Sequence, residues 1–296
     1  MTDRTPTSPV ADPGVQGELY VVSTPIGNLG DMTFRAVEVL REASVVLAED
    51  TRHSRPLLAH FEVRTPLVAY HEHNEARMTE PVLGRLRAGE RVALITDAGT
   101  PLLSDPGARL VAAAAAAGIR VVPVPGASAL LSALVAAALP ADRFTFYGFP
   151  PRKGSERAAL MAEVAALPHT AVLYEAPGRV ASTLADLARA AGGDRPAVVA
   201  RELTKQFEEV RRGTLASLAA YYDEAPPRGE VVLVVGGQPP VEADEDALRA
   251  LAVELRAAGH SGRDLVRALT GAGASRNVAY RLAHDSDGDA EGEDEG

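Results

Sequence analysis

Short runs of β-branched and other apolar residues alternate with longer Ala- and Leu-rich stretches in the first half of the chain. The apolar runs predict strands at Leu19–Ser23, Ser44–Ala48, Thr65–Ala69, Arg91–Ile95 and Arg120–Val124. The stretches between them predict helices at Thr33–Glu42, Arg55–His60, Met78–Ala88 and Ala108–Ala117. Strands that alternate with helices of this length indicate βαβ units, so we expect an α/β domain over residues 17–139 with a mainly parallel sheet.

The second half repeats this alternation with one difference. Strands are expected at Phe144–Gly148, Ala171–Tyr174, Ala197–Arg201, Glu208–Arg212 and Glu230–Val235, with helices at Ser155–Leu167, Val180–Ala191 and Leu215–Tyr222. The run around Glu208–Arg212 ends at Gly213-Thr214 and is typical of a hairpin strand rather than a crossover. We therefore expect a second α/β domain over residues 140–238 with a mixed sheet, joined to the first through Leu139–Asp142.

The C-terminal part of the chain has a different pattern. Three helical stretches are expected at Asp244–Ala258, Gly262–Thr270 and Arg276–His284, and the segment from Leu255 to His284 holds five Arg and one Asp. Helix, glycine-containing turn and helix outline a helix-turn-helix unit, so residues 242–284 are expected to form a basic helical domain. A capping helical pair with a solvated basic face is the alternative. Residues 1–16 and 285–296 are expected to be a disordered lead and a disordered acidic tail.

Composition and charge exclude several classes of protein. The 296 residues contain no Cys, which excludes disulfides, thiolate metal sites and a cysteine nucleophile. No apolar run approaches the ~20 residues that span a bilayer, and no secretion signal is present, so we expect a cytoplasmic protein. Seven of the ten net negative charges lie in the last twelve residues, so the acidic balance does not exclude a nucleic-acid partner. Only 2 of the 30 basic residues are Lys, namely Lys153 and Lys205.

Polar and small residues follow most of the expected strands. The segments are TPIGNLGD, AEDTR, TDAGTPLLSDPG and PGASA in the first half, and YGFPPRK, YEAPGR and RELTK in the second. Because ligands bind α/β sheets at the carboxyl ends of strands, these segments predict one cleft between the two domains. Neither a G-x-G-x-x-G fingerprint nor a P-loop is present, and His71 and His73 lack a convincing third ligand, so no metal site is expected.

In this order, these segments resemble the bacterial ribosomal RNA small-subunit methyltransferase I family, within the tetrapyrrole-methylase-like fold. The resemblance covers roughly residues 19–237, and the helical C-terminal segment also fits. It implies S-adenosylmethionine as cofactor, a homodimer, and 16S rRNA or the small ribosomal subunit as partner. The implied reaction is 2′-O-methylation of a cytidine ribose, conventional position 1402, in the decoding region of 16S rRNA.

Matching the motif positions assigns roles to individual residues. The positions expected around the cofactor are Pro25, Ile26, Asp97, Gly99, Thr100, Leu103, Ser128, Ala129, Tyr147, Ala176, Leu203 and Gly229. Ser128 is alternatively only a helix N-cap. The residues expected to bind RNA are Arg52, Arg152, Lys153, Arg263, Arg267 and Arg276.

Three residues are candidates for catalysis. A ribose hydroxyl is a poor nucleophile, so a base or a charge that favours the alkoxide helps the transfer. Lys205 is the first candidate, and Glu202 and Asp50 compete for the role of base. Two other functions remain open on the residues alone: a methylase of a tetrapyrrole or another small molecule on the same fold, and a non-catalytic RNA-binding assembly protein.

Overall fold

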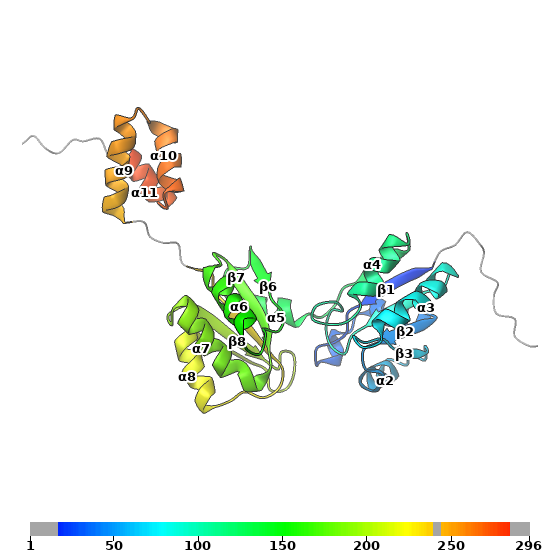
Figure 1. The fold of residues 1–296 in the computed structure, drawn as a ribbon. Helices are drawn as coiled ribbons and strands as arrows, with labels where there is room; N and C mark the ends of the chain where they lie inside the picture. Colours follow the sequence, from blue (N-terminus) through cyan, green and yellow to red (C-terminus); the bar gives the residue numbers. More distant parts are fainter. Residues whose placement is uncertain (1–16, 239–243, 285–296) are drawn as a thin grey trace, which may run out of the picture. The chain divides into compact units, whose positions relative to one another are not determined.

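The computed structural model describes residues 17–238 and 244–284. The predicted lead, the predicted acidic tail and the start of the predicted helical domain at 242–243 lie outside these residues. The chain divides into two compact units, residues 1–237 and residues 238–296, and each is described by itself (Figure 1). In the described part of the chain, no helix is both long enough and apolar enough to cross a membrane.

The first sheet is wholly parallel and has the strand order β3-β2-β4-β1-β5. Its strands are β1 (Glu18–Val22), β2 (Val45–Ala48), β3 (Leu67–Ala69), β4 (Val92–Ile95) and β5 (Arg120–Val124). The helices of this part are η1 (Leu29–Asp31), α1 (Phe34–Glu42), α2 (Thr51–His60), α3 (Glu75–Arg87) and α4 (Ala108–Ala116). The expected parallel sheet is confirmed.

Helices cover both faces of this sheet. All four residues of β2 and all four of β4 are buried, which explains why these strands read as continuous apolar runs. Alternate side chains, such as Leu47 and Leu94, face a cluster with α3 and α4, whereas Val46 and Ile95 face a cluster with α1 and α2. The carboxyl edge of the sheet is therefore the part that is free to carry long loops.

The second sheet is mixed, with the strand order β6-β7-β10-β8-β9. Its strands are β6 (Phe144–Phe146), β7 (Thr170–Glu175), β8 (Pro196–Arg201), β9 (Glu209–Thr214) and β10 (Val231–Val235). Only β6 and β7 pair in parallel, and β9 pairs antiparallel with β8, as the hairpin pattern predicted. One face packs on helices α6 (Ser155–Ala166), α7 (Val180–Ala191) and α8 (Leu215–Glu224), with η2 (Pro177–Arg179) before α7.

Helix α5 (Ala129–Ala137) covers the other face of the second sheet. Its buried residues Leu130 and Leu134 lie in one cluster with Val198, Val232 and Val234 from β8 and β10. The sequence places this helix before the predicted linker at residue 139, among the elements of the first domain. Its packing partners are nevertheless those of the second domain, because α5 carries the apolar face that this sheet needs to bury.

The C-terminal unit consists of helices α9 (Glu245–Ala257), α10 (Gly262–Gly271) and α11 (Arg276–His284). Leu248, Leu265, Leu269 and Leu282 form its own apolar core. Asp244 caps the start of α9 by accepting a hydrogen bond from the backbone N–H of Asp246. The unit is therefore a small helical body with a core separate from those of the two sheets.

Candidate functional site

The loops that follow β1 and β4 are joined at the carboxyl edge of the first sheet. The backbone N–H of Thr24 donates to the carbonyl of Gly99 at 2.8 Å, and the N–H of Gly99 donates to the carbonyl of Thr24 at 3.0 Å. β1 and β4 are neighbours in the sheet although six helices and strands lie between them in sequence. The chain leaves β1 towards β2 on one side of this pair and leaves β4 towards β5 on the other, so the strand order changes direction between β1 and β4. Such a switch point is where parallel α/β sheets bind ligands.

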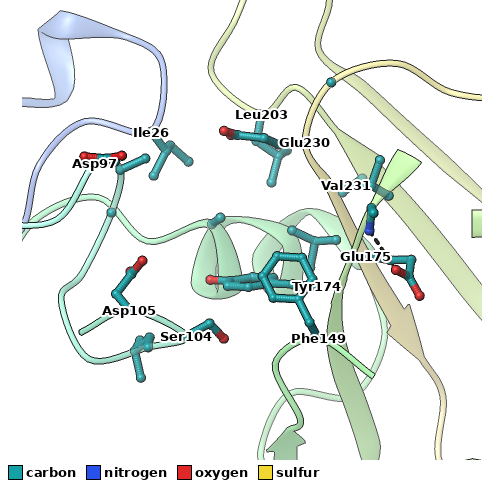
Figure 2. A pocket seen from close by; sticks show the side chains of 18 of the residues that line it. Ile26, Asp97, Ser104, Asp105, Phe149, Tyr174, Glu175, Leu203, Glu230 and Val231 are labelled. Carbon is teal, nitrogen blue, oxygen red and sulfur yellow. Dashed lines mark hydrogen bonds between the residues drawn. The ribbon is translucent and has the colours of Figure 1, made fainter. Parts of the chain in front are cut away.

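A pocket of about 460 Å³ opens at this edge and is lined by residues of both α/β halves. Figure 2 shows Asp97 and Asp105 from the β4 loop on one side, with Phe149 from the loop after β6 and Tyr174 and Glu175 from β7 across from them. The lining residues are Ile26, Glu49, Asp97, Ala98, Gly99, Thr100, Leu103, Ser104, Asp105, Ala129, Phe149, Tyr174, Glu175, Ala176, Pro177, Ala200, Leu203, Gly229, Glu230, Val231 and Val232. The volume lies in the range of small-molecule sites.

The loops that build the pocket hold unusual backbone conformations. Leu102 and Ser104, after β4, have φ of 77° and 69°, and Glu202 and Thr204, after β8, have φ of 50° and 67°. Positive φ is unfavourable for residues with a side chain and clusters at ligand sites in many proteins. Both pairs fall inside segments that the sequence singled out, TDAGTPLLSDPG and RELTK.

One wall of the pocket is acidic. Glu49, Asp97 and Asp105 lie there together, and the hydroxyl of Thr96 donates to Glu49 Oε2 at 3.2 Å. Burial, aided by the charges of Glu49 and Asp97, raises the pKa of Asp105 to about 6. Burial and the charge of Asp97 also raise the pKa of Glu49. Asp105 therefore gains its negative charge as the pH rises through about 6.

Lys205 is held between two carboxylates. Its Nζ donates to Glu202 Oε1 at 2.9 Å and to Glu230 Oε2 at 3.1 Å. Glu202 also accepts from the backbone N–H of Glu230 at 3.0 Å, and Gly229 is so close that a β-carbon there would stand 2.2 Å from Glu202 Oε1. Burial lowers the pKa of Lys205, but the hydrogen bonds to the two carboxylates outweigh it and the net shift is upward. The ammonium is therefore charged at neutral pH.

The pKa of Glu202 is lowered, first by the hydrogen bond from the backbone of Glu230 and then by the one from Lys205. A carboxylate whose charged form is stabilised in this way is a weak proton acceptor. The pKa of Asp50 is also lowered, because Arg52 donates hydrogen bonds to it at 3.0 and 2.6 Å. Both predicted alternative bases are thus engaged in ion pairs.

The structure brings most of the predicted cofactor residues together. Nine of them line the pocket: Ile26, Asp97, Gly99, Thr100, Leu103, Ala129, Ala176, Leu203 and Gly229. Pro25, Ser128 and Tyr147 do not line it. Ser128 caps α5 by accepting from the N–H of Leu131 at 3.4 Å. Tyr147 packs against the α6–α8 side of the second sheet and donates to Glu163 at 3.0 Å, and burial together with this hydrogen bond raises its pKa to about 12.

The predicted catalytic and RNA-binding residues lie outside the lining. Asp50 caps α2, and Lys205 and Glu202 stand behind Gly229 and Glu230. Arg52, Arg152 and Lys153 are exposed on unit 1. Arg263, Arg267 and Arg276 are exposed on the C-terminal unit.

Sequence reasoning missed several residues of the pocket. Glu49 belongs to the AEDTR segment and Asp105 to TDAGTPLLSDPG, so their place at strand ends was a usable signal. Phe149 and Tyr174 come from YGFPPRK and YEAPGR. Glu230 precedes the last strand and follows Gly229, which was expected at the cofactor, so its position was also a usable signal. Among the described residues, no group of three or more His, Cys, Asp or Glu is arranged to hold a metal ion.

Comparison with known proteins supplies a family. The family model of tetrapyrrole (corrin/porphyrin) methylases matches residues 18–219. The chain is 46% identical to the ribosomal RNA small subunit methyltransferase I of Synechocystis sp. over 89% of this chain and 92% of that protein. It is 52% identical to the Xylella fastidiosa protein of the same name over 79% and 85% of the two chains. A uroporphyrin-III C-methyltransferase from Thermus thermophilus, solved with S-adenosyl homocysteine, shares the fold at a TM-score of 0.54 and 22% identity, over 74% of this chain and 97% of that chain.

Proposed function

Since the chain belongs to the ribosomal RNA small subunit methyltransferase I family, we propose that it methylates the 2′-hydroxyl of a cytidine ribose in the decoding region of 16S rRNA. The methyl donor is S-adenosylmethionine, which when bound supplies a methyl group on a positively charged sulfonium. The convergence of nine predicted cofactor positions on one pocket carries this proposal.

The residues of the pocket fit this cofactor. Ile26, Leu103, Leu203 and Val232 offer apolar walls that suit a nucleoside base. The acidic wall around Asp97 suits a cation, because fixed negative charge in a partly enclosed site is felt strongly. Gly99, with φ of 85°, and Gly229, with φ of 82°, let the backbone pass where a side chain would be strained.

We assign the charge-stabilising role to Lys205. Lys205 does not itself line the pocket, but its ammonium is fixed by Glu202 and by Glu230, and Glu230 belongs to the lining. A fixed cation favours the alkoxide form of a nearby hydroxyl without having to reorganise during the reaction. Lys205 does not take the proton in this scheme, because its raised pKa keeps the amine protonated at neutral pH.

The proton acceptor is a separate question, and Asp105 answers it better than Glu202 or Asp50. Asp105 lines the pocket, and its pKa of about 6 leaves it mostly ionised at neutral pH, yet more basic than an ordinary carboxylate. The carboxylates of Glu202 and Asp50 are stabilised in their charged forms and lie outside the lining. We therefore place the base on the acidic wall of the pocket, with Asp105 as its first candidate.

The RNA side of the proposal rests on exposed arginines and lysines. Arg52, Arg152 and Lys153 are exposed on unit 1, and Arg263, Arg267 and Arg276 are exposed on the C-terminal unit. Guanidinium groups bind phosphates in two-pronged geometry and give RNA binding its salt dependence. Because the two units have separate cores, the C-terminal unit acts in this proposal as an RNA-binding module.

A homodimer is also part of the proposal. The outward face of α5 exposes Leu131 by 52% and Val135 by 85%, although the opposite face of the helix is buried on the second sheet. An exposed apolar helix face of this kind suits contact with a second copy. Sedimentation equilibrium of the protein and of Val135→Asp tests it: the substitution is expected to shift the mass from dimer to monomer.

The decisive experiment uses small ribosomal subunits from a strain that lacks this gene. Purified protein and radiolabelled cofactor are added, and the label is located by nuclease digestion and mass mapping. We expect one methyl group on the ribose of one 16S cytidine. Methylation of a base, or of a tetrapyrrole but no RNA, would reassign the acceptor. Cofactor binding without methyl transfer to either acceptor would favour the non-catalytic RNA-binding alternative.

A further inference from the structure

A second, open pocket of about 560 Å³ lies beside the first. The function proposed above uses its Arg152 as an RNA contact but assigns no ligand to the cavity. It is lined by Phe149, Pro150, Pro151, Arg152, Ala176 and Arg179. Phe149 and Ala176 also line the first pocket, so the two cavities meet at these residues. A ligand too large for the first pocket alone can therefore occupy both.

The aromatic wall of this second pocket is held in place. The Phe149 ring is 56% exposed, and its centroid lies 5.6 Å from that of Tyr174 at an interplanar angle of 62°. Tyr174 in turn contacts Phe146 edge-on, with centroids 4.8 Å apart. Edge-to-face contacts of this kind fix a ring while leaving one of its faces open. An exposed Phe in a fixed orientation is suited to stack on a flat partner.

Pro150 and Pro151, which line this pocket, each accept a backbone hydrogen bond from an arginine side chain. Arg179 donates to the carbonyl of Pro150 at 3.3 Å, and Arg157, which is buried, donates to that of Pro151 at 3.1 Å. Arg179 is itself oriented by the fully buried carboxylate of Glu175, to which its Nε donates at 2.6 Å. The guanidinium of Arg179 is thus preorganised at the pocket wall.

The second cation of this pocket, Arg152, is exposed, and among the described residues it has neither an ion-pair nor a hydrogen-bond partner. Lys153, also exposed, follows it in the chain. An unengaged guanidinium beside a fixed aromatic ring matches the two parts of a nucleotide, its phosphate and its base. Sequence-tolerant binding of single strands uses this combination of stacking and charge.

Resting on the function proposed above, we propose that this second pocket receives the unstacked base of the acceptor nucleotide, with Phe149 stacking on the base and Arg152 binding the adjacent phosphate. A ribose whose base lies in the second pocket reaches the first at the shared residues Phe149 and Ala176. An unstacked nucleotide is also what single-stranded RNA presents to aromatic side chains. The pocket thereby selects a nucleotide that has left its helical stack.

Phe149 and Arg152 supply the variants for a test on the full-length protein. In Phe149→Leu the apolar bulk remains and the stacking face is lost, whereas Phe149→Tyr keeps the ring. Because the stacking of one base is lost, Phe149→Leu is expected to weaken binding to unmethylated small subunits by roughly 5- to 150-fold, and Phe149→Tyr to restore it. Arg152→Gln is expected to reduce the salt slope of binding by about 0.7, and Arg143→Gln, an exposed arginine outside both pockets, serves as its control.

Two readouts besides activity locate the base. Calorimetry with S-adenosylhomocysteine measures the first pocket, and we expect its affinity to be unchanged in Arg152→Gln. Subunits reconstituted with 5-iodocytidine at the acceptor position are irradiated with the wild-type protein, and the crosslinked peptide is expected to contain Phe149. Crosslinking to a peptide elsewhere, or unchanged subunit binding by Phe149→Leu, would overturn the proposal. A loss of cofactor affinity in Arg152→Gln would also overturn it, because the second pocket would then bind part of the cofactor.

These outcomes are distinct from a failure of the proposed function. If wild-type protein transfers no methyl group to unmethylated subunits, the function itself is wrong. If the wild type methylates the cytidine and Phe149→Leu binds, crosslinks and turns over as the wild type does, only the placement of the base is wrong.

Discussion

The side chain of Lys205 lies across Gly27, and a β-carbon built on Gly27 would stand 2.4 Å from Cγ of Lys205 and 2.6 Å from its Cε. Gly27 has φ of 146° and belongs to the loop after β1, whereas Lys205 follows β8 of the other sheet. The absence of a side chain at residue 27 is what lets the lysine pass and reach Glu202 and Glu230. This close approach couples the two halves of unit 1 beside the pocket.

The first prediction concerns this pair. Lys205→Ala is expected to lower the single-turnover methylation rate at saturating RNA by ~10²-fold, the usual scale for a lost group that assists proton movement or charge. Gly27→Ala is expected to reproduce much of that loss, because the new methyl group displaces the lysine side chain.

Gly192→Ala is the matched control for this pair. Gly192 has φ of 90°, and a β-carbon there meets nothing within 4 Å, so this variant carries backbone strain without displacing a side chain. A Lys205→Ala enzyme with a normal saturated rate and a raised RNA requirement would make Lys205 a phosphate contact instead.

A second prediction concerns the pH dependence of the rate. Asp105 accepts a proton only in its ionised form, and its pKa is about 6. The single-turnover rate is therefore expected to rise as the pH rises through about 6 and to level off above it. Asp105→Asn is expected to lower the plateau and remove this acidic limb. If the acidic limb is unchanged in that variant, another group is responsible for it, and Glu49→Gln is the next variant to measure.

A third prediction gives the effect of Asp105 on stability. Its folded pKa lies above the ordinary value, so the folded state binds more protons than the unfolded state between about pH 4 and pH 6. The stability that protonated Asp105 contributes is present below this window and is lost as the pH rises through it. Asp105→Asn is thus expected to raise the free energy of unfolding near pH 8 by roughly 1 kcal/mol, after allowance for solvent screening, and to change it little near pH 4. The shift is measured as a higher thermal midpoint at pH 8 than the wild type has.

A fourth prediction separates a pocket residue from a structural one. Gly99 lines the pocket, has φ of 85°, and would place a β-carbon 3.3 Å from Ile26, so Gly99→Val is expected to weaken S-adenosylhomocysteine binding at least tenfold by calorimetry. Ser128 caps α5 and does not line the pocket, so Ser128→Ala is expected to cost about 1 kcal/mol of stability and leave this affinity intact.

Gly118→Val controls for strain in this comparison. Gly118 has φ of 72° and a β-carbon there meets nothing within 4 Å. Should Gly118→Val weaken the cofactor as much as Gly99→Val does, backbone strain rather than pocket shape would be the cause.

The last prediction concerns the C-terminal unit. Neutralising Arg263, Arg267 and Arg276 to Gln in the full chain is expected to weaken subunit binding and to lower its salt slope by about 0.7 for each lost phosphate contact. Cofactor affinity is expected to stay the same. Arg249→Gln is the control, since Arg249 in the same unit is held by both Glu245 at 2.8 Å and Asp246 at 3.5 Å, whereas Arg267 has one looser pair with Asp264 at 3.7 Å. If the triple variant and the wild type bind subunits with equal affinity across a salt series, these arginines do not bind RNA.

The local pattern of apolar and polar residues was sufficient to predict the strands and helices and much of the fold. Strands β2 and β4 are buried on both faces, so their apolar runs are unbroken and unmistakable. The hairpin of β8 and β9 was readable because its turn leaves no room for a crossover helix. The strand-end motifs were predictable as a site because parallel strands share one carboxyl edge.

The sequence by itself determined which segments are strands and helices, and which loops carry chemistry, because apolar periodicity and turn residues act over a few positions. Tertiary structure alone decided that α5 packs on the second sheet, that Glu49 and Asp105 share a wall, and that Tyr147 faces away from the pocket. It also decided that Lys205 is clamped between Glu202 and Glu230. Those encounters depend on how loops with positive φ redirect the chain, and residues distant in sequence meet only after both sheets have packed.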